Sequence, residues 1–256
     1  MRIIISPAKK MREDLDSLAW QDLPRFLPQT QKILDMLRGM SYQQLKKLWG
    51  CNDRLTAQNV ERLERMDLHQ RLTPALLSYE GIQYRYMAPG VFTNGEWDYV
   101  QEHLRILSGF YGLLRPLDGV TPYRLEMQAR LAVGGAKDLY AYWSGRLAQA
   151  LGEEDSCILN LASREYSSAV SRHLPSSVRL VTCVFGEEQE GKVVEKGTLC
   201  KMARGEMVRF LAQRRAESPE AARDFDRLGY RFAPERSDQC TLVFVRSVEE
   251  GETSSQ

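Results

Sequence analysis

Apolar and polar positions follow two spacings along this chain, one typical of strands and one typical of helices. The first apolar run, residues 2–5, is continuous and rich in β-branched side chains, which predicts a buried strand. The polar residues 6–10 follow it as a turn. From residue 28 to about residue 81 the pattern is helical, which predicts a helical wrapping around the strand core.

Capping signals mark where those helices begin and end. Ser41 and Gln44 stand three positions apart and form a predicted capping box. Thr73 followed by Pro74 predicts a further helix start, and Gly81 predicts a helix stop. The first third of the chain is therefore expected to be mainly helical.

The second half interleaves strand and helix patterns. Strands are predicted at residues 157–161, 178–185, 192–199 and 241–246, and helices at residues 138–151, 163–170 and 200–215, with one more opened by Ser218 and Pro219. The elements follow no regular β-α-β repeat, and no Pro/Gly/Ser linker divides the chain. We therefore expect an α+β fold, a single domain at residues 1–248 with a central mixed β-sheet wrapped by helices, and a disordered tail at residues 249–256.

Composition narrows the class of protein. The chain has 256 residues, 43% of them hydrophobic, and 35 Lys and Arg against 34 Asp and Glu, so any affinity for nucleic acid must come from a local patch. Its five cysteines include no C-x-x-C pair, which is typical of a reduced, cytoplasmic chain. The apolar start is too short for a signal peptide or membrane span. We expect a monomer with no membrane partner.

Metal and thiol chemistry have weak support in the sequence. His69, His103 and His173 are isolated, without the spacing of a metal site, so we expect no metal and no cofactor. A redox-sensing thiol should stand beside positive charge, and Cys200, next to Lys201, comes nearest to that description.

The most informative stretch is residues 104–127, where three glycines, two prolines, three arginines and two carboxylates interrupt an apolar run. Leucines and Tyr111 recur there at helical spacing, but Gly109 and Gly112 break the helix. Charged side chains held at such bends are typical of binding sites.

Three other places combine polar side chains with a strand end or a helix start. Lys9, after the first strand, is either a ligand-binding lysine or a solvated one. Ser163 either caps its own helix or marks a helix N-terminus that is open to an anion. Lys201 and Arg204 share one helix face, which either grips phosphate or is simply solvated.

The stretch at residues 104–127 permits two functional interpretations and a structural one. In the first, Gly109 and Gly112 let the backbone approach DNA phosphates without reading the bases. In the second, side chains converge in a pocket that orients a small polar ligand and moves a proton. The residues of that pocket would be Arg115, Asp118, Tyr123, Arg124 and Glu126. In the third, the same charges form a buried network that fixes the turns.

Taken together, these motifs resemble one family closely over nearly the full chain, that of the peroxide stress protein YaaA. The matching pieces are IISPAK at residues 4–9, LR at 104–105 with LSGFYG at 107–112, LRPLD at 114–118, PYRLEM at 122–127, DLY at 138–140 with Trp143, NLAS at 160–163 with Glu165 and Tyr166, and Lys201 with Ala203, Arg204 and Gly205. Their common order along the chain makes the resemblance far more specific than any one motif.

The resemblance implies a cytoplasmic bacterial protein that limits the iron-driven damage of hydrogen peroxide. It also implies binding of double-stranded or distorted DNA through backbone contacts, with a positively charged cleft and a helix-hairpin-helix element at about residues 107–116. The glycines of such hairpins commonly stand two apart, whereas Gly109 and Gly112 stand three apart. The residues expected to bind DNA or another ligand are Ser6, Lys9, Gly109, Gly112, Arg115, Tyr123, Arg124, Asn160, Ser163, Tyr166, Lys201 and Arg204.

Carboxylates in the same motifs keep an enzyme in view, because carboxylates repel phosphate and DNA binding gives no reason for them. Candidate catalytic residues are Asp118, Glu126 and Glu165. Carboxylate and amide groups hydrogen-bond a base edge, and tyrosine rings stack on a base. The alternative is therefore an enzyme that acts on a nucleotide or nucleobase, by cleavage or transfer at the glycosidic bond. Whether the protein is an enzyme stays open at this point.

Overall fold

Parallel strands form the middle of the sheet that organises the molecule. The computed structural model describes residues 1–246, and within them the strand order is β11-β12-β9-β8-β1-β5-β6, with β10 paired to β9. The parallel strands are β1 (Arg2–Ile5), β5 (Leu104–Ser108), β8 (Cys157–Asn160), β9 (Arg179–Gln189) and β12 (Thr241–Arg246). The antiparallel additions are β6 (Gly112–Leu114), β10 (Lys192–Val194) and β11 (Tyr230–Phe232).

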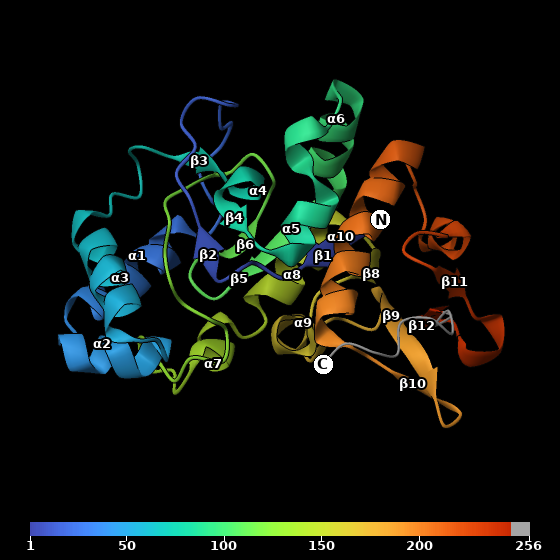
Figure 1. Ribbon diagram of the computed structural model, residues 1–256. Helices are drawn as coiled ribbons and strands as arrows, with labels where there is room; N and C mark the ends of the chain where they lie inside the picture. Colours follow the sequence, from blue (N-terminus) through green and yellow to red (C-terminus); the bar gives the residue numbers. More distant parts are fainter. Residues whose placement is uncertain (247–256) are drawn as a thin grey trace.

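Helices surround this sheet, as Figure 1 shows, with α1, α2 and α3 together at the end remote from β11 and β12. The helices are α1 (Leu27–Arg38), α2 (Tyr42–Trp49), α3 (Asp53–Arg65), α4 (Ala75–Ser78), α5 (Ile82–Met87), α6 (Asn94–His103), α7 (Leu139–Trp143), α8 (Arg146–Glu154), α9 (Arg164–Ser171) and α10 (Gly197–Arg214). Short 3-10 turns are η1 (Pro89–Val91), η2 (Pro219–Asp224) and η3 (Pro234–Arg236). Two-stranded ribbons pair β2 (Lys10–Met11) with β4 (Tyr79–Glu80) and β3 (Thr73–Pro74) with β7 (Gly119–Val120).

The expected α+β fold with a mixed central sheet wrapped by helices is confirmed. The strands predicted at residues 2–5 and 241–246 have the observed bounds, and the Ser41 and Gln44 capping box opens α2. The sheet is buried on both faces at its centre, where Ile3, Ile4 and Ile5 are inaccessible to solvent. The tail predicted at residues 249–256 lies outside the described residues.

The segment at residues 107–116 is a β-hairpin, so the helix-hairpin-helix expected there is wrong. Strands β5 and β6 pair antiparallel, with Ile106 opposite Leu114 and Ser108 opposite Gly112. Strand β5 is buried along its whole length, and a strand buried on both faces has a continuous apolar pattern that also fits a helix. The apparent helical spacing is therefore a property of a central strand.

Other boundaries also differ from the prediction. Thr73 is extended in β3 and does not cap a helix, in keeping with the restriction that Pro74 places on the residue before it. Gly81 stands at the start of α5, because glycine serves at both ends of helices. The helix predicted at residues 138–151 is divided into α7 and α8, since Ser144 has a positive φ. The strand predicted at residues 192–199 ends at Val194.

The crossing of α5 and α10 holds two distant parts of the chain together. A Cβ at Gly205 of α10 would overlap the Gln83 carbonyl oxygen and lie 2.9 Å from the Met87 backbone nitrogen. Only glycine allows the two helix backbones to approach so closely. Side chains of α5 and α10 that lie near this crossing are therefore presented from one packed unit.

No helix within residues 1–246 is both long enough and apolar enough to cross a membrane.

Candidate functional site

A pocket of about 400 Å³ lies at the carboxyl ends of β1 and β8, and we call it the carboxyl-edge pocket. Ser6 enters it directly after β1, and Ser163 enters it after β8 at the start of α9. In sheets with parallel strands, ligands bind in crevices at this edge, where the loops after the strands converge. The topology therefore explains why segments from far apart in the sequence meet here.

The two strand-end serines hold each other. The Ser6 hydroxyl donates to Ser163 Oγ at 3.2 Å and accepts from the Ser163 backbone N–H at 2.8 Å. Ser163 makes no side-chain capping bond to α9, so the interpretation in which it caps its own helix is wrong. Asn160 orders this loop from outside the pocket, because its Oδ1 accepts from the Ala162 N–H at 2.9 Å. The N-terminus of α9 therefore faces the pocket without a side-chain cap.

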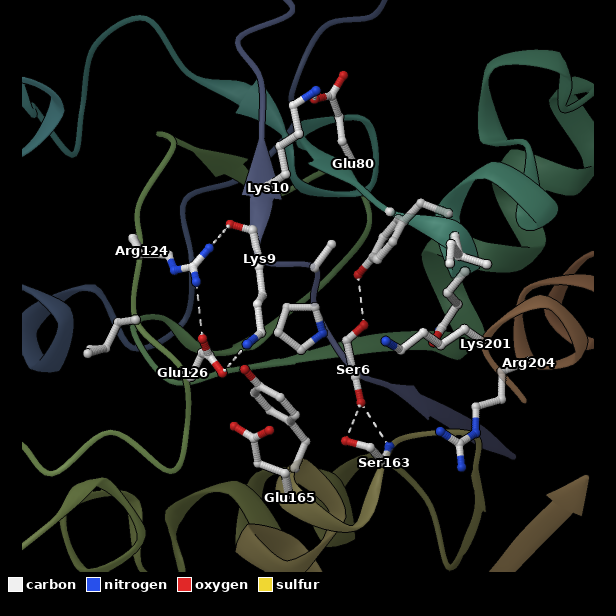
Figure 2. Close-up of a pocket in the computed structure, with 18 of the residues that line it drawn as sticks. Ser6, Lys9, Lys10, Glu80, Arg124, Glu126, Ser163, Glu165, Lys201 and Arg204 are labelled. Atoms are coloured by element: carbon white, nitrogen blue, oxygen red, sulfur yellow. Dashed lines mark hydrogen bonds and ion pairs between the residues drawn. The ribbon is translucent and has the colours of Figure 1, made fainter. Parts of the chain in front are cut away.

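One wall of the pocket carries a neutralised carboxylate. Glu126 accepts Lys9 Nζ at 2.9 Å and Arg124 Nη2 at 3.3 Å, while Arg124 Nη1 donates to the Lys9 carbonyl oxygen at 3.2 Å. We call these three residues the Glu126 cluster (Figure 2). Because both Glu126 oxygens have a cationic partner, this wall presents far less negative charge than its sequence suggests.

A second carboxylate stands beside that cluster. Glu165, at the start of α9, is half-buried, and its Oε1 accepts from the Gln128 backbone N–H at 3.3 Å. Burial raises the pKa of Glu165, and the negative charge of Glu126 raises it further. Glu165 therefore holds a proton more readily than an ordinary glutamate does.

The opposite wall carries hydrogen-bond donors from α5 and α10. Figure 2 shows Lys201 reaching from α10 toward Ser6, with Arg204 beside it, on the side of Ser6 away from Glu126 and Glu165. Among residues 1–246, Lys201 makes no ion pair, and Arg204 pairs through Nη2 with Glu195 at 3.3 Å.

Gln83 completes this wall and is only 7% exposed, yet its Nε2 has no hydrogen-bond partner among the described residues. We call Gln83, Lys201 and Arg204 the donor cluster. Sequence reasoning missed Gln83, since a glutamine in a short helix carries no signal that separates it from a surface residue.

The tyrosines of the pocket are held by the core. Tyr123 OH is hydrogen-bonded to Ser108 at 2.7 Å and to Tyr79 at 2.8 Å, and burial raises the pKa of Tyr123 to about 12. Burial also raises the pKa of Tyr166. Both side chains line the pocket as neutral phenols at physiological pH.

The glycines of the hairpin serve packing against protein. A Cβ at Gly109 would lie 3.0 Å from the Glu126 carbonyl carbon and 3.0 Å from the Leu125 oxygen, so this glycine lets the Glu126 backbone approach β5. A Cβ at Gly112, whose φ is +77°, would lie 2.7 Å from the Trp143 ring. Neither glycine lines the carboxyl-edge pocket.

Arg115 and Asp118 lie elsewhere, at a separate cavity of about 230 Å³ lined also by Arg105 and Glu154. Asp118 is buried, its Oδ2 accepts from the Arg115 backbone N–H at 2.8 Å, and burial raises its pKa to about 7. Arg115 pairs loosely with Asp22, at 3.8 Å. This geometry matches the third interpretation of the sequence, a buried network that fixes a turn.

A second cavity of about 660 Å³ adjoins the carboxyl-edge pocket, and the Glu126 cluster forms the wall between them. Its lining includes Lys47 of α2 and Arg130, together with Gly50, which follows α2. Basic side chains therefore line both cavities on either side of the Glu126 cluster.

The candidate redox thiol, Cys200, lies outside the lining of the carboxyl-edge pocket. Cys200 is buried, its thiol donates to the Phe185 carbonyl oxygen at 3.0 Å, and burial raises its pKa to about 11. Within residues 1–246, no three His, Cys, Asp or Glu side chains are grouped as metal ligands.

Comparisons with known proteins bear on the whole chain. A family model described as peroxide stress protein YaaA matches residues 1–236. A UPF0246 protein of Lachnoclostridium phytofermentans is 52% identical over 246 residues, which cover 96% of this chain and 96% of that protein. UPF0246 proteins of Agathobacter rectalis and Desulfitobacterium hafniense are 50% and 49% identical, over 97% and 98% of this chain and 100% of each relative.

Proposed function

The chain belongs to the family of the peroxide stress protein YaaA, and on that premise we propose that it acts in the bacterial cytoplasm during peroxide stress by binding DNA through backbone contacts. The observation that carries the proposal is the pair of adjoining cavities lined by basic side chains from α2, α10 and the loops between. Phosphate contacts from such side chains position a protein on DNA without reading sequence.

The paired state of Glu126 answers the objection that carboxylates repel phosphate. Lys9 and Arg124 neutralise this carboxylate, so the wall between the cavities offers little repulsion to a strand lying across it. Lys47 and Lys201 make no ion pair among residues 1–246, and both remain free to meet phosphates. These two lysines, one in each cavity, are the residues on which the proposal depends most directly.

A salt-dependent DNA titration tests the proposal, with duplex and branched substrates. We expect Lys47→Ala and Lys201→Ala each to weaken binding and to reduce the slope of log affinity against log salt by about one. Lys192→Ala, at a lysine of β10 outside both cavities, serves as the matched control and should bind like the wild type. Salt-independent binding, or equal loss in the control, would overturn the proposal.

A second candidate function is an enzyme acting on a nucleotide or nucleobase, and the raised pKa of Glu165 favours it. A protonated carboxyl group in a pocket can donate its proton to a leaving base while water adds at the sugar carbon of the glycosidic bond. The test incubates the protein with mononucleotides and follows base release by chromatography, with Glu165→Gln as the comparison. Release that stops in the variant supports this function, and intact nucleotides with both proteins contradict it.

A further inference from the structure

The donor cluster offers more hydrogen-bond donors than the protein itself uses. The Gln83 amide is buried with its Nε2 unpartnered, and Arg204 Nε is likewise buried without a partner among residues 1–246. A buried donor that makes no hydrogen bond costs about 1 to 3 kcal/mol, so native structures rarely keep one without a reason. Gln83 and Arg204 both line the carboxyl-edge pocket, so an acceptor bound there is the nearest candidate partner for these donors.

The charge on this wall selects an anionic acceptor. Lys201 has no ion pair within the described residues, and Glu195 occupies only one edge of the Arg204 guanidinium. The N-terminus of α9, which carries no side-chain cap, faces the same pocket and adds a partial positive charge. The carboxylates Glu126 and Glu165 lie on the other side of Ser6 (Figure 2).

The wall behind the donor cluster is closed where α5 and α10 cross, so a phosphate bound there has its chain toward the open side of the pocket. The backbones of α5 and α10 touch at Gly205, directly beside Gln83, so no strand can leave the pocket between these helices. An internal phosphodiester would have to turn both of its chain segments toward that open side. A terminal phosphomonoester has chain on one side only, and it presents three acceptor oxygens and nearly two negative charges.

We propose that Gln83, Lys201 and Arg204 form a subsite for the terminal phosphomonoester of a nucleotide. The nucleotide is either a free mononucleotide or the phosphorylated end of a DNA strand, and the Glu126 cluster faces its sugar and base. For DNA ends, the inference rests on the function proposed above.

Competition binding tests the subsite with defined probes. Oligonucleotides that carry a 3′-phosphate, a 5′-phosphate or only hydroxyl ends compete with a fluorescent duplex, and deoxyadenosine monophosphate is compared with deoxyadenosine. We expect one phosphorylated end to bind about tenfold more tightly than the hydroxyl end, which is the effect of one or two charge-assisted hydrogen bonds. Equal affinities for phosphorylated and unphosphorylated probes would overturn the subsite.

Two conservative variants test the subsite without disrupting the fold. Gln83→Glu puts a carboxylate of the same shape against the anion, and Lys201→Gln removes charge from an exposed position that no described residue pairs with. Each should abolish the preference for the phosphorylated probe, whereas Lys192→Gln should retain it. A preference that survives Lys201→Gln in a folded protein contradicts the proposal.

The two proposals can fail separately in this experiment. If DNA of every kind fails to bind while deoxyadenosine monophosphate binds more tightly than deoxyadenosine, the DNA-binding function fails and the subsite stands. If DNA binds in a salt-dependent manner with no preference for phosphorylated ends or for the mononucleotide, the subsite fails and the DNA-binding function stands.

Discussion

Glu126 and Asp118 come from the same charged stretch of sequence, yet the fold uses them in opposite ways. Glu126 lies at a pocket wall, where it pairs with Lys9 and Arg124. Asp118 is buried beneath a turn, accepts a backbone N–H and has its pKa raised to about 7. In sequence, a carboxylate near an arginine indicates a constrained bend in either case. Whether that carboxylate is accessible to a ligand depends on how deeply the fold buries it.

The sharpest way to test the difference is to remove the Asp118 side chain. Asp118→Ala leaves the Arg115 N–H without its acceptor, and we expect a loss of about 2 to 3 kcal/mol in the free energy of unfolding, measured by urea denaturation. DNA affinity should be unchanged in the folded variant. Asp118→Asn keeps an acceptor oxygen and should cost clearly less. A variant that is stable but binds DNA poorly would show that Asp118 contributes to DNA binding and not to stability.

Gly109 offers a way to disturb Glu126 without touching its charge. Gly109→Ala brings a methyl group against the backbone at residues 125–127, which must shift, and we expect a loss of about 1 to 2 kcal/mol in stability. DNA binding should weaken as well, because a shift of residues 125–127 separates Glu126 from Lys9 and Arg124 and leaves its carboxylate less completely neutralised. Gly90→Ala, where a Cβ would meet nothing within 4 Å, is the control. Unchanged stability and binding in Gly109→Ala would show that the close contact between Gly109 and the backbone of residues 125–127 is not needed.

The pH dependence of stability tests the burial of Asp118. The folded protein holds a proton on Asp118 up to about pH 7, whereas the unfolded chain releases it near 3.8. Stability from this group is therefore complete below about pH 4 and falls as pH rises to about 7, by up to about 1.4 kcal/mol per pH unit. Denaturation of wild type and Asp118→Asn across this range measures the difference. Parallel curves for the two proteins would contradict the assigned burial.

The smallest effect is expected at Glu126. Glu126→Gln keeps hydrogen-bond acceptance and removes a charge whose partner Lys9 is largely exposed, so stability should change by less than about 1 kcal/mol. DNA affinity should stay the same or rise, because Lys9 and Arg124 then present uncompensated positive charge. A marked loss of DNA affinity in the salt titration would assign Glu126 a direct contact with the ligand.

Much of the architecture could be predicted from the sequence because periodicity and capping are local. Strand β1, strand β12 and the helix that begins at Ser41 follow directly from short patterns. Strand β5 could not be separated from a helix, because a strand buried on both faces loses its alternation. The local sequence pattern does not distinguish strand from helix where burial on both faces removes the alternation of apolar and polar residues.

The candidate site shows the same division. The serines at the ends of β1 and β8 could be anticipated, since strand ends attract polar residues and the order of motifs located them. Gln83 could not, because its significance arises only from burial beside α10. Nor could Arg115 be separated from Arg124, since the fold turns one toward a different cavity. The burial of a side chain and the cavity that it faces depend on the packing of helices against the sheet, which the local sequence does not specify.

The close crossing at Gly205 also has a consequence for the time course of binding. Gln83, Lys201 and Arg204 project from two helices that are already in backbone contact. The donors are therefore positioned before a ligand binds, and no closing movement of that wall is needed. Encounter should then be similarly fast for every nucleic-acid end that reaches the pocket. Ligands should differ mainly in how long they stay, so discrimination is expected in the dissociation rate.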